Sequence, residues 1–372
     1  MSAAVLVVEL VARAVALYAS SAYWSQSMHT STLSGQAWVD ELISGHPDRM
    51  KINFGMPLHV FTGLIIELRL LGVTDTKHVS LEEKLGIFLY TCVTGMSCRL
   101  VGERFQRSKD TVTCVFREIL RVLSGPRFYT KFVRLPAVEN PPAPYLQNNP
   151  KFWPFFDKCL GALDGTHIIC STSANMRDHK GSLSQNVFVI TNFNFRFVYV
   201  LSGCFIYSDA RLNDLPVPDG YYYLGNTGFP QCAQVLVPYR GVQFHLREWA
   251  AGNRKPFERI FGVLKKCWQV LVVPMNYSME LQARIPIALC ALHNFMLEMD
   301  GPEAFAEELA RAHDPAGKDL QNLIAEPMWV QYQDYIATHA AADELEEEPE
   351  EEPDDVGVGE DEDDNNNVEM NV

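Results

Sequence analysis

Two acidic residues lie in segments that are otherwise apolar, and both could take part in chemistry. Asp164 falls within residues 160–169, an apolar run that predicts a strand. Glu258 falls within residues 256–268, whose apolar spacing predicts a helix with Pro256 in its first turn. An isolated carboxylate is costly to bury, so an acid in a strand is commonly paired, metal-bound or at a rim.

Basic residues surround Glu258 in the sequence. They are Arg254, Lys255, Arg259, Lys265 and Lys266. A solvated helix face accounts for such a cluster, and so does a surface that binds phosphate beside an acid. The second interpretation makes the first four of these residues candidate DNA contacts.

The elements that must position the two acids alternate in type. Residues 160–170, 186–193, 195–206 and 220–224 are predicted strands, and residues 256–268 are a predicted helix. The second and third strands are close enough to form a hairpin around Asn194. A hairpin, a crossover, a further strand and a helix predict a mixed α/β domain.

The N-terminal third is predicted to be helical throughout. Helices are expected at residues 1–24 and 36–44, in a run after Pro57, and from Ser80, where Glu83 completes a capping-box pattern. The first predicted helix contains Glu9 and Arg13 and lacks a basic segment before it, which favours an amphipathic helix. We therefore expect it to pack on the first domain rather than to act as a signal peptide or membrane span.

Residues 97–124 have the pattern of a helix-turn-helix, with Ser108 as the cap of the second helix. Apolar residues recur at helical spacing on one side of that helix. An ordinary helical hairpin satisfies the same pattern. The candidate DNA contacts around the turn are Arg99, Arg104, Arg107, Lys109 and Thr113.

The charge of the chain is strongly uneven. The net charge is −15, yet sixteen of the 46 Asp and Glu residues lie from Asp343 onward, which leaves 30 acids against 31 Lys and Arg. The body is thus close to neutral and can carry a local basic face. Residues 341–372 are predicted to be a disordered acidic tail. Nine dispersed cysteines predict reduced thiols rather than disulfides or a zinc site.

Six blocks follow one another over about 150 residues. They are residues 148–156, the Asp164 strand, residues 220–225, 238–241 and 261–266, and residues 291–295. Together, and in this order, they resemble the nuclease domain of the PIF/Harbinger transposases and of genes derived from them. The resemblance implies an RNase H-like core in which two Asp and one Glu hold two Mg²⁺ or Mn²⁺ ions and DNA is cut. Asp164 matches the first acid and Glu258 the third.

The middle acid is where this chain departs from the family. Asn226 stands at the expected position after the strand at residues 220–224, and a neutral amide adds no charge to a metal site. The implied ligand set is therefore Asp164, Asn226 and Glu258. Asp209 matches another aspartate of the family, which makes Asp164, Asp209 and Glu258 the alternative catalytic set. His293 lies in an apolar helix, where a structural histidine is favoured over a catalytic one.

The predicted organisation has four parts. They are a helical domain at residues 1–135, a proline-rich connector at 136–147, an RNase H-like domain with flanking helices at 148–340, and the tail. The predicted function is a metal-dependent DNA endonuclease of transposase type in the nucleus, with the cytoplasm as a second location. The alternative is a DNA-binding protein that keeps the fold without cleavage. The resemblance also implies a Myb-like accessory partner and a homo-oligomer, and no membrane.

Overall fold

The computed structural model describes residues 3–25, 27–136, 144–148, 153–170, 184–203, 217–225, 228–229, 232–237, 255–274 and 277–301. The chain divides into two compact units, Met1–Asp314 and Pro315–Val372, and all described residues belong to the first. The predicted acidic tail, Asp209, Asn226 and Arg254 lie outside the described residues.

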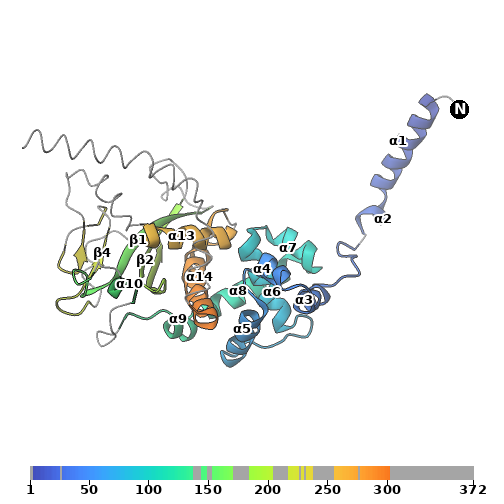
Figure 1. Ribbon diagram of the computed structural model, residues 1–372. Coiled ribbons are helices and arrows are strands. Elements are labelled where there is room, and N and C mark those ends of the chain that lie inside the picture. The colour runs from blue at the N-terminus through green and yellow to red at the C-terminus, as the bar shows by residue number, and fades with distance from the viewer. Residues whose placement is uncertain are drawn as a thin grey trace, which may run out of the picture. The chain divides into compact units, whose positions relative to one another are not determined.

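Helices build the N-terminal part, as predicted (Figure 1). They are α1 (Ala3–Ala19), α2 (Ser21–Trp24), α3 (Gly35–Ser44), α4 (Pro47–Phe54), α5 (Leu58–Leu70), α6 (Leu81–Thr94), α7 (Cys98–Phe105), α8 (Lys109–Leu123) and α9 (Pro126–Phe132). The hydroxyls of Ser34, Ser80 and Ser108 each accept a hydrogen bond from a backbone N–H of the helix that follows. Such caps satisfy donors that have no partner within the helix.

Helix α1 does not pack on the helical domain as expected. None of its residues is buried, and most of its large apolar side chains are more than half exposed. Its two charged residues pair with each other, since Arg13 Nη2 lies 2.6 Å from Glu9 Oε1. The expectation rested on amphipathicity, but the helix is apolar around most of its circumference and has a single charged pair. No described helix is both long and apolar enough to cross a membrane.

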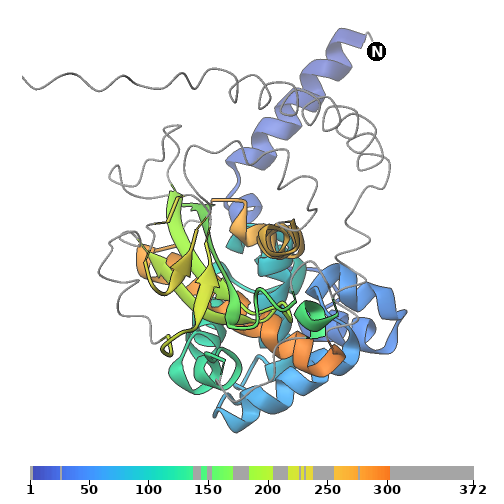
Figure 2. The same cartoon turned by 60° about the vertical axis from the view of Figure 1, so that its left-hand side comes forward.

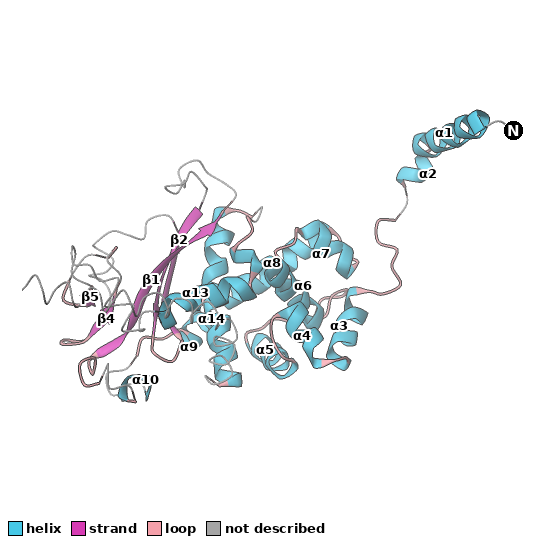
Figure 3. Ribbon diagram, turned by 45° about the horizontal axis from the view of Figure 1, so that its top comes forward, coloured by secondary structure: helices cyan, strands magenta, loops and turns pink. Residues whose placement is uncertain are grey.

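A five-stranded mixed sheet follows a short helix, α10 (Pro144–Gln147) (Figure 3). Its strands are β1 (Cys159–Ile169), β2 (Ser184–Thr191), β3 (Phe197–Gly203), β4 (Tyr222–Leu224) and β5 (Val235–Leu236), in the order β3-β2-β1-β4-β5. The strands β1, β2 and β3 pair antiparallel, whereas β4 pairs parallel with both β1 and β5. The predicted hairpin around Asn194 is confirmed, because β2 and β3 are consecutive and paired.

The long helix α14 (Met279–Asp300) contacts both the sheet and the helical part. It touches β3, α5, α8 and α9, and it lies between the strands and the helices in Figure 1 and Figure 2. The helix α13 (Lys255–Cys267) and the turn η2 (Gln269–Leu271) precede it. One continuous apolar core joins residues of α3 to α9, α13, α14, β2 and β3. The two predicted domains therefore share a core in their described parts.

Two side chains of helix α14 hold the edge strand β3 and the turn that precedes it. Asn294 in α14 accepts a hydrogen bond from the Phe197 N–H (2.9 Å), and its amide donates to the Phe197 and Phe132 carbonyls (2.6 and 2.8 Å). The neighbouring His293 lies 3.0 Å from the Phe195 carbonyl through Nε2, and burial lowers its pKa to about 4. A buried neutral imidazole bound to a backbone carbonyl supports the structural role predicted for His293.

A proline inside α14 leaves a carbonyl that β2 satisfies. Pro286 has no N–H, so the Gln282 carbonyl four residues earlier lacks its usual helical donor. The buried Gln185 of β2 donates from Nε2 to that carbonyl at 3.0 Å. This bond connects the sheet to α14 at the point where the helix is weakest.

Replacing Gln185 with Leu should lower the free energy of unfolding by about 1–3 kcal/mol, because a buried carbonyl loses its donor. Pro286→Ala restores the N–H within the helix, so the same Leu substitution should then cost less than about 1 kcal/mol. Urea unfolding of the four proteins in this cycle measures both values. An equal cost in the two backgrounds would show that the Gln185 bond does not substitute for the missing helical one.

Candidate functional site

Asp164 lies in the middle of β1, where the sequence predicted it. Its side chain is partly buried, and Oδ1 accepts a hydrogen bond from the Gly165 N–H at 2.8 Å. Alternate residues of a strand face the same side, so Asp164 and Thr166 share a face with Ile168, which belongs to the core under α13 and α14. Asp164 pairs with Val189 of β2, which belongs to the same core. The carboxylate therefore lies on the face of the sheet that α13 covers.

Lys265 of α13 reaches β1 next to Asp164. Its Nζ donates to Thr166 Oγ1 at 2.7 Å and to the His167 carbonyl at 2.9 Å. Partial burial lowers the pKa of the ammonium group, and the nearby Asp164 carboxylate opposes that shift. The sequence predicted Lys265 only as a DNA contact. The structure places it against the strand that carries the first acid.

Strand β4 brings the next segment of the predicted site to the same strand. Leu224, its last residue, pairs with Ala162 in parallel register, two residues before Asp164. Asn226 follows Leu224 by two positions in the sequence. The short β4 thus ends beside the part of β1 that leads into Asp164.

Glu258 lies in α13, as predicted, seven residues before Lys265. Seven residues are two helical turns, so positions 258 and 265 share one side of the helix about 10 Å apart along its axis. The side chains of residues 255–259, including Lys255 and Arg259, lie outside what the structure describes. Within the part of the chain that is described, no three His, Cys, Asp or Glu residues form a group that could hold a metal ion.

The two helices predicted within residues 97–124 are present as α7 and α8, joined by a turn. Gln106 takes the left-handed conformation (φ 54°) at the end of α7. Gly102 lies so close to the turn that a Cβ atom there would be 2.5 Å from the Arg107 carbonyl oxygen, so the tight turn requires glycine. Both features are local to this hairpin, and neither distinguishes DNA binding from a structural role.

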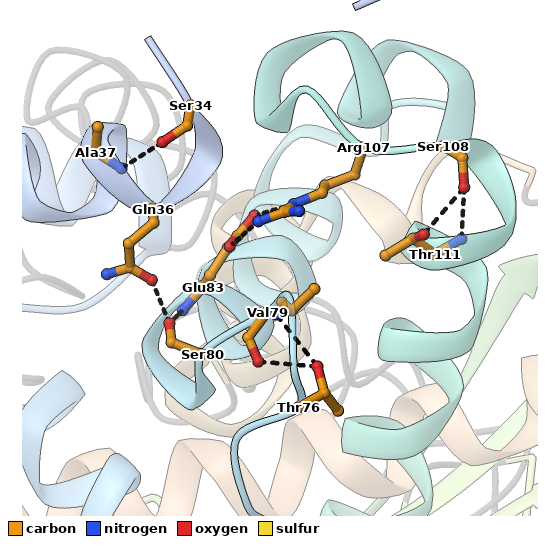
Figure 4. A network of polar contacts seen from close by, with 10 residues as sticks. All are labelled: Ser34, Gln36, Ala37, Thr76, Val79, Ser80, Glu83, Arg107, Ser108 and Thr111. Carbon is orange, nitrogen blue, oxygen red and sulfur yellow. Dashed lines mark hydrogen bonds and ion pairs between the residues drawn. The ribbon is translucent and has the colours of Figure 1, made fainter.

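Arg107 forms a bidentate ion pair with Glu83 of α6 (Figure 4). Its Nε and Nη2 lie 2.8 Å from the two carboxylate oxygens, and Glu83 is fully buried. The capping-box prediction is thus half confirmed. The Ser80 hydroxyl accepts from the Glu83 N–H at 3.0 Å, but the Glu83 carboxylate binds Arg107.

The other candidates on these two helices differ in accessibility. The Arg104 guanidinium lies 3.8 Å from the centre of the Trp38 ring, and burial lowers its pKa. Thr113 donates from its hydroxyl to the Lys109 carbonyl within α8 at 2.8 Å. Arg99 and Lys109 are exposed. Arg104 and Arg107 therefore hold the helical part together, while Arg99 and Lys109 are accessible to a ligand.

Comparison with known proteins identifies the region that carries Asp164. Residues 163–294 match the DDE superfamily endonuclease family, and residues 30–125 match a domain of unknown function. This endonuclease match and a curated relative both support the resemblance of this chain to Harbinger-type, transposase-derived proteins. The match begins one residue before Asp164 and ends at Asn294, so it includes most of β1, all of β2 to β5, α13 and most of α14.

One curated relative is the protein named "Protein ALP1-like" from Arabidopsis thaliana. It is 22% identical over 284 residues, which cover 63% of this chain and 65% of the relative. The chain thus spans slightly less than two thirds of that relative's length. No solved structure matches the chain.

Proposed function

We propose that this protein is a divalent-metal-dependent DNA endonuclease built on an RNase H-like sheet. The observation that carries the proposal is the DDE superfamily endonuclease match over the domain whose central strand bears Asp164. The sheet order supports the proposal, because the antiparallel hairpin of β2 and β3 is followed by a crossover to β4, which pairs parallel with β1. Positions 164 and 258 both lie on elements that meet at this face, since α13 contacts β1.

The chemistry of the donors fits a hard dication. Carboxylate oxygens are the ligands that Mg²⁺ prefers, and Mn²⁺ accepts the same set. Asp164 and Glu258 would hold the metal, with Asp209 or Asn226 as the third ligand. Divalent ions in such a site activate water and neutralise charge on the leaving oxygen of a phosphodiester. Among this chain's own cations, Arg254, Lys255 and Arg259 would position the DNA phosphates.

The proposal is tested by incubating the purified chain with supercoiled plasmid in Mg²⁺ or Mn²⁺, and in EDTA. Nicking that depends on the metal is the expected result. A protein that binds the plasmid but leaves it intact in both metals would contradict the proposal and would support the alternative function. That alternative is a DNA-binding protein without cleavage, and Asn226 at the position of the family's middle acid favours it.

Asn226→Asp should raise both Mn²⁺ affinity and nicking if position 226 supplies the middle ligand, because a carboxylate adds the charge that an amide lacks. A gain of roughly tenfold in each is expected. If Asp209 supplies that ligand instead, Asp209→Ala should abolish nicking while Asn226→Asp changes little. Calorimetry with Mn²⁺ and the nicking assay on both variants separate the two arrangements. Our placement of the middle ligand is wrong if neither substitution changes either measurement.

We further propose that the α7–α8 hairpin binds DNA phosphates through its exposed cations. Replacing Arg99 and Lys109 together with Ala should weaken DNA binding and reduce the slope of log K against log salt by about one unit per lost contact. Lys51→Ala with Lys77→Ala is the matched control, because it removes two exposed cations from elsewhere in the helical part. Equal slopes in the two double variants would make the hairpin a purely structural element.

A DNA substrate places the protein in the nucleus, and this location belongs to the proposal. A Myb-like accessory protein and a homo-oligomer remain expectations that the resemblance raises. Fractionation of cells that express the tagged chain tests the location directly.

A further inference from the structure

We infer that Lys265 is a built-in counter-cation of Asp164 and that it weakens the binding of divalent metal at this site. The inference concerns one side chain that the sequence predicts only as a candidate DNA contact and to which the proposed function assigns no role. Its metal-binding part rests on the proposed function. Its pairing part, between Lys265 and Asp164, can be measured without metal.

The position of the ammonium group is fixed by two hydrogen bonds. Lys265 Nζ lies 2.7 Å from Thr166 Oγ1 and 2.9 Å from the His167 carbonyl oxygen. Thr166 is two residues after Asp164 on the same strand, so the two side chains leave the same face about 7 Å apart. The lysine side chain is therefore directed at β1. A lysine on a solvated helix face would instead extend into water.

A comparison with Lys266 shows that the contact with β1 is specific to Lys265. Lys266 is exposed, whereas Lys265 is partly buried between α13 and β1. Lys265 is flanked by the buried Leu264 and by Val263, and both belong to the core. A cation held at a strand in this way gives up part of its hydration, which an adjacent carboxylate compensates. Asp164 is the carboxylate on that strand face.

A dication bound to Asp164 must share the carboxylate with this ammonium group. A unit positive charge about 7 Å from a divalent ion opposes its binding by roughly tenfold, even when the medium screens as well as water. An Asp at position 226 would offset this repulsion, but this chain has Asn226. The Lys265 ammonium group thus neutralises part of the Asp164 charge. In a site with three acids, a bound metal ion would do this.

Lys265→Gln is the best test, because the amide keeps a donor for Thr166 and the His167 carbonyl but removes the charge. Lys265→Met removes the donor as well and serves as a second variant. Lys266→Gln is the matched control, since it removes the same charge one position away from an exposed site. Mn²⁺ binding is measured by calorimetry on the full chain. Urea unfolding in EDTA is measured for Lys265→Gln, Asp164→Asn and the double variant.

The expected result has two parts. Lys265→Gln binds Mn²⁺ about tenfold more tightly than the wild type, while Lys266→Gln stays within about twofold. In EDTA, the effects of Lys265→Gln and Asp164→Asn on the unfolding equilibrium constant are coupled by at least about fivefold, and Lys266→Gln shows no such coupling with Asp164→Asn.

Two other outcomes are distinguishable. Mn²⁺ binding that is equal in the wild type and Lys265→Gln, or an absence of coupling in EDTA, overturns the inference even if the wild type nicks DNA. A chain that binds no Mn²⁺ in any variant contradicts the proposed metal-dependent function, and the metal-binding part of the inference with it.

Discussion

Asp164→Asn and Glu258→Gln are each expected to lower metal-dependent nicking by at least about a hundredfold. Each change removes one of the few carboxylates that could hold a dication at the face between β1 and α13. Both substitutions keep the size of the side chain, so the strand and the helix should stay folded. Asp164→Asn keeps an oxygen that can accept the Gly165 N–H, which lies 2.8 Å from Oδ1.

Matched controls separate a loss of metal ligands from a general change in charge. Asp157 is exposed two residues before β1, and Glu280 is exposed in the first turn of α14. Asp157→Asn and Glu280→Gln should therefore nick DNA as the wild type does. The nicking rate is followed on supercoiled plasmid in Mn²⁺, with thermal unfolding as a check of folding. Equal rates in all five proteins would eliminate the two acids as ligands and attribute any nicking to another protein in the preparation.

Arg107→Ala is expected to lower the free energy of unfolding by about 3–5 kcal/mol, because it leaves the fully buried Glu83 carboxylate without its partner. Space around Glu83 is limited, since a Cβ added to Gly35 would lie 2.4 Å from Glu83 Oε1. Rearrangement therefore offers little relief. Urea unfolding at neutral pH, followed by circular dichroism, measures the loss.

An adjacent ion pair provides the comparison. Arg69 lies 2.9 Å from Glu82, but both side chains are substantially solvent-accessible, so Arg69→Ala should cost less than about 1 kcal/mol. The double variant Glu83→Leu, Arg107→Met should be more stable than Arg107→Ala, because it leaves no unpaired buried charge. A cost for Arg107→Ala that is as small as that of Arg69→Ala would mean that the carboxylate reaches water. Because Arg107→Ala is expected to destabilise the protein, weaker DNA binding by this variant would not by itself identify Arg107 as a DNA contact.

The contacts of Arg104 and Arg107 also show why a positive side chain near a helix-turn-helix is not by itself a DNA contact. Arg104 and Arg107 lie beside the turn in sequence, where first contacts to DNA are expected. In the structure one stacks on Trp38 and the other binds Glu83. The pattern that would have indicated this is Glu83 itself, an acid among the apolar positions of a predicted helix.

The sequence determined those features that depend on residues a few positions apart. Apolar spacing located α8 and α13, alternation and length located β1 to β4, and the short interval around Asn194 defined the hairpin. It also placed Asp164 in a strand and Glu258 in a helix. The helix α4 and the strand β5 are not among the predicted elements. Proline at the first helical position begins α4, although proline also ends helices, and β5 is too short to show alternation.

Only the tertiary structure decided which distant residues meet. Lys265 binds Thr166 across 99 positions, Asn294 binds Phe132 across 162, and Arg107 binds Glu83 across 24. Periodicity and capping describe interactions within one or two turns, and they do not predict which residue on another element a side chain will contact. Whether a cation faces a carboxylate, a ring or water depends on how the elements pack, because burial sets the cost of leaving a charge alone. For this reason the sequence located Asp164 and Lys265 separately, and packing alone brought them together.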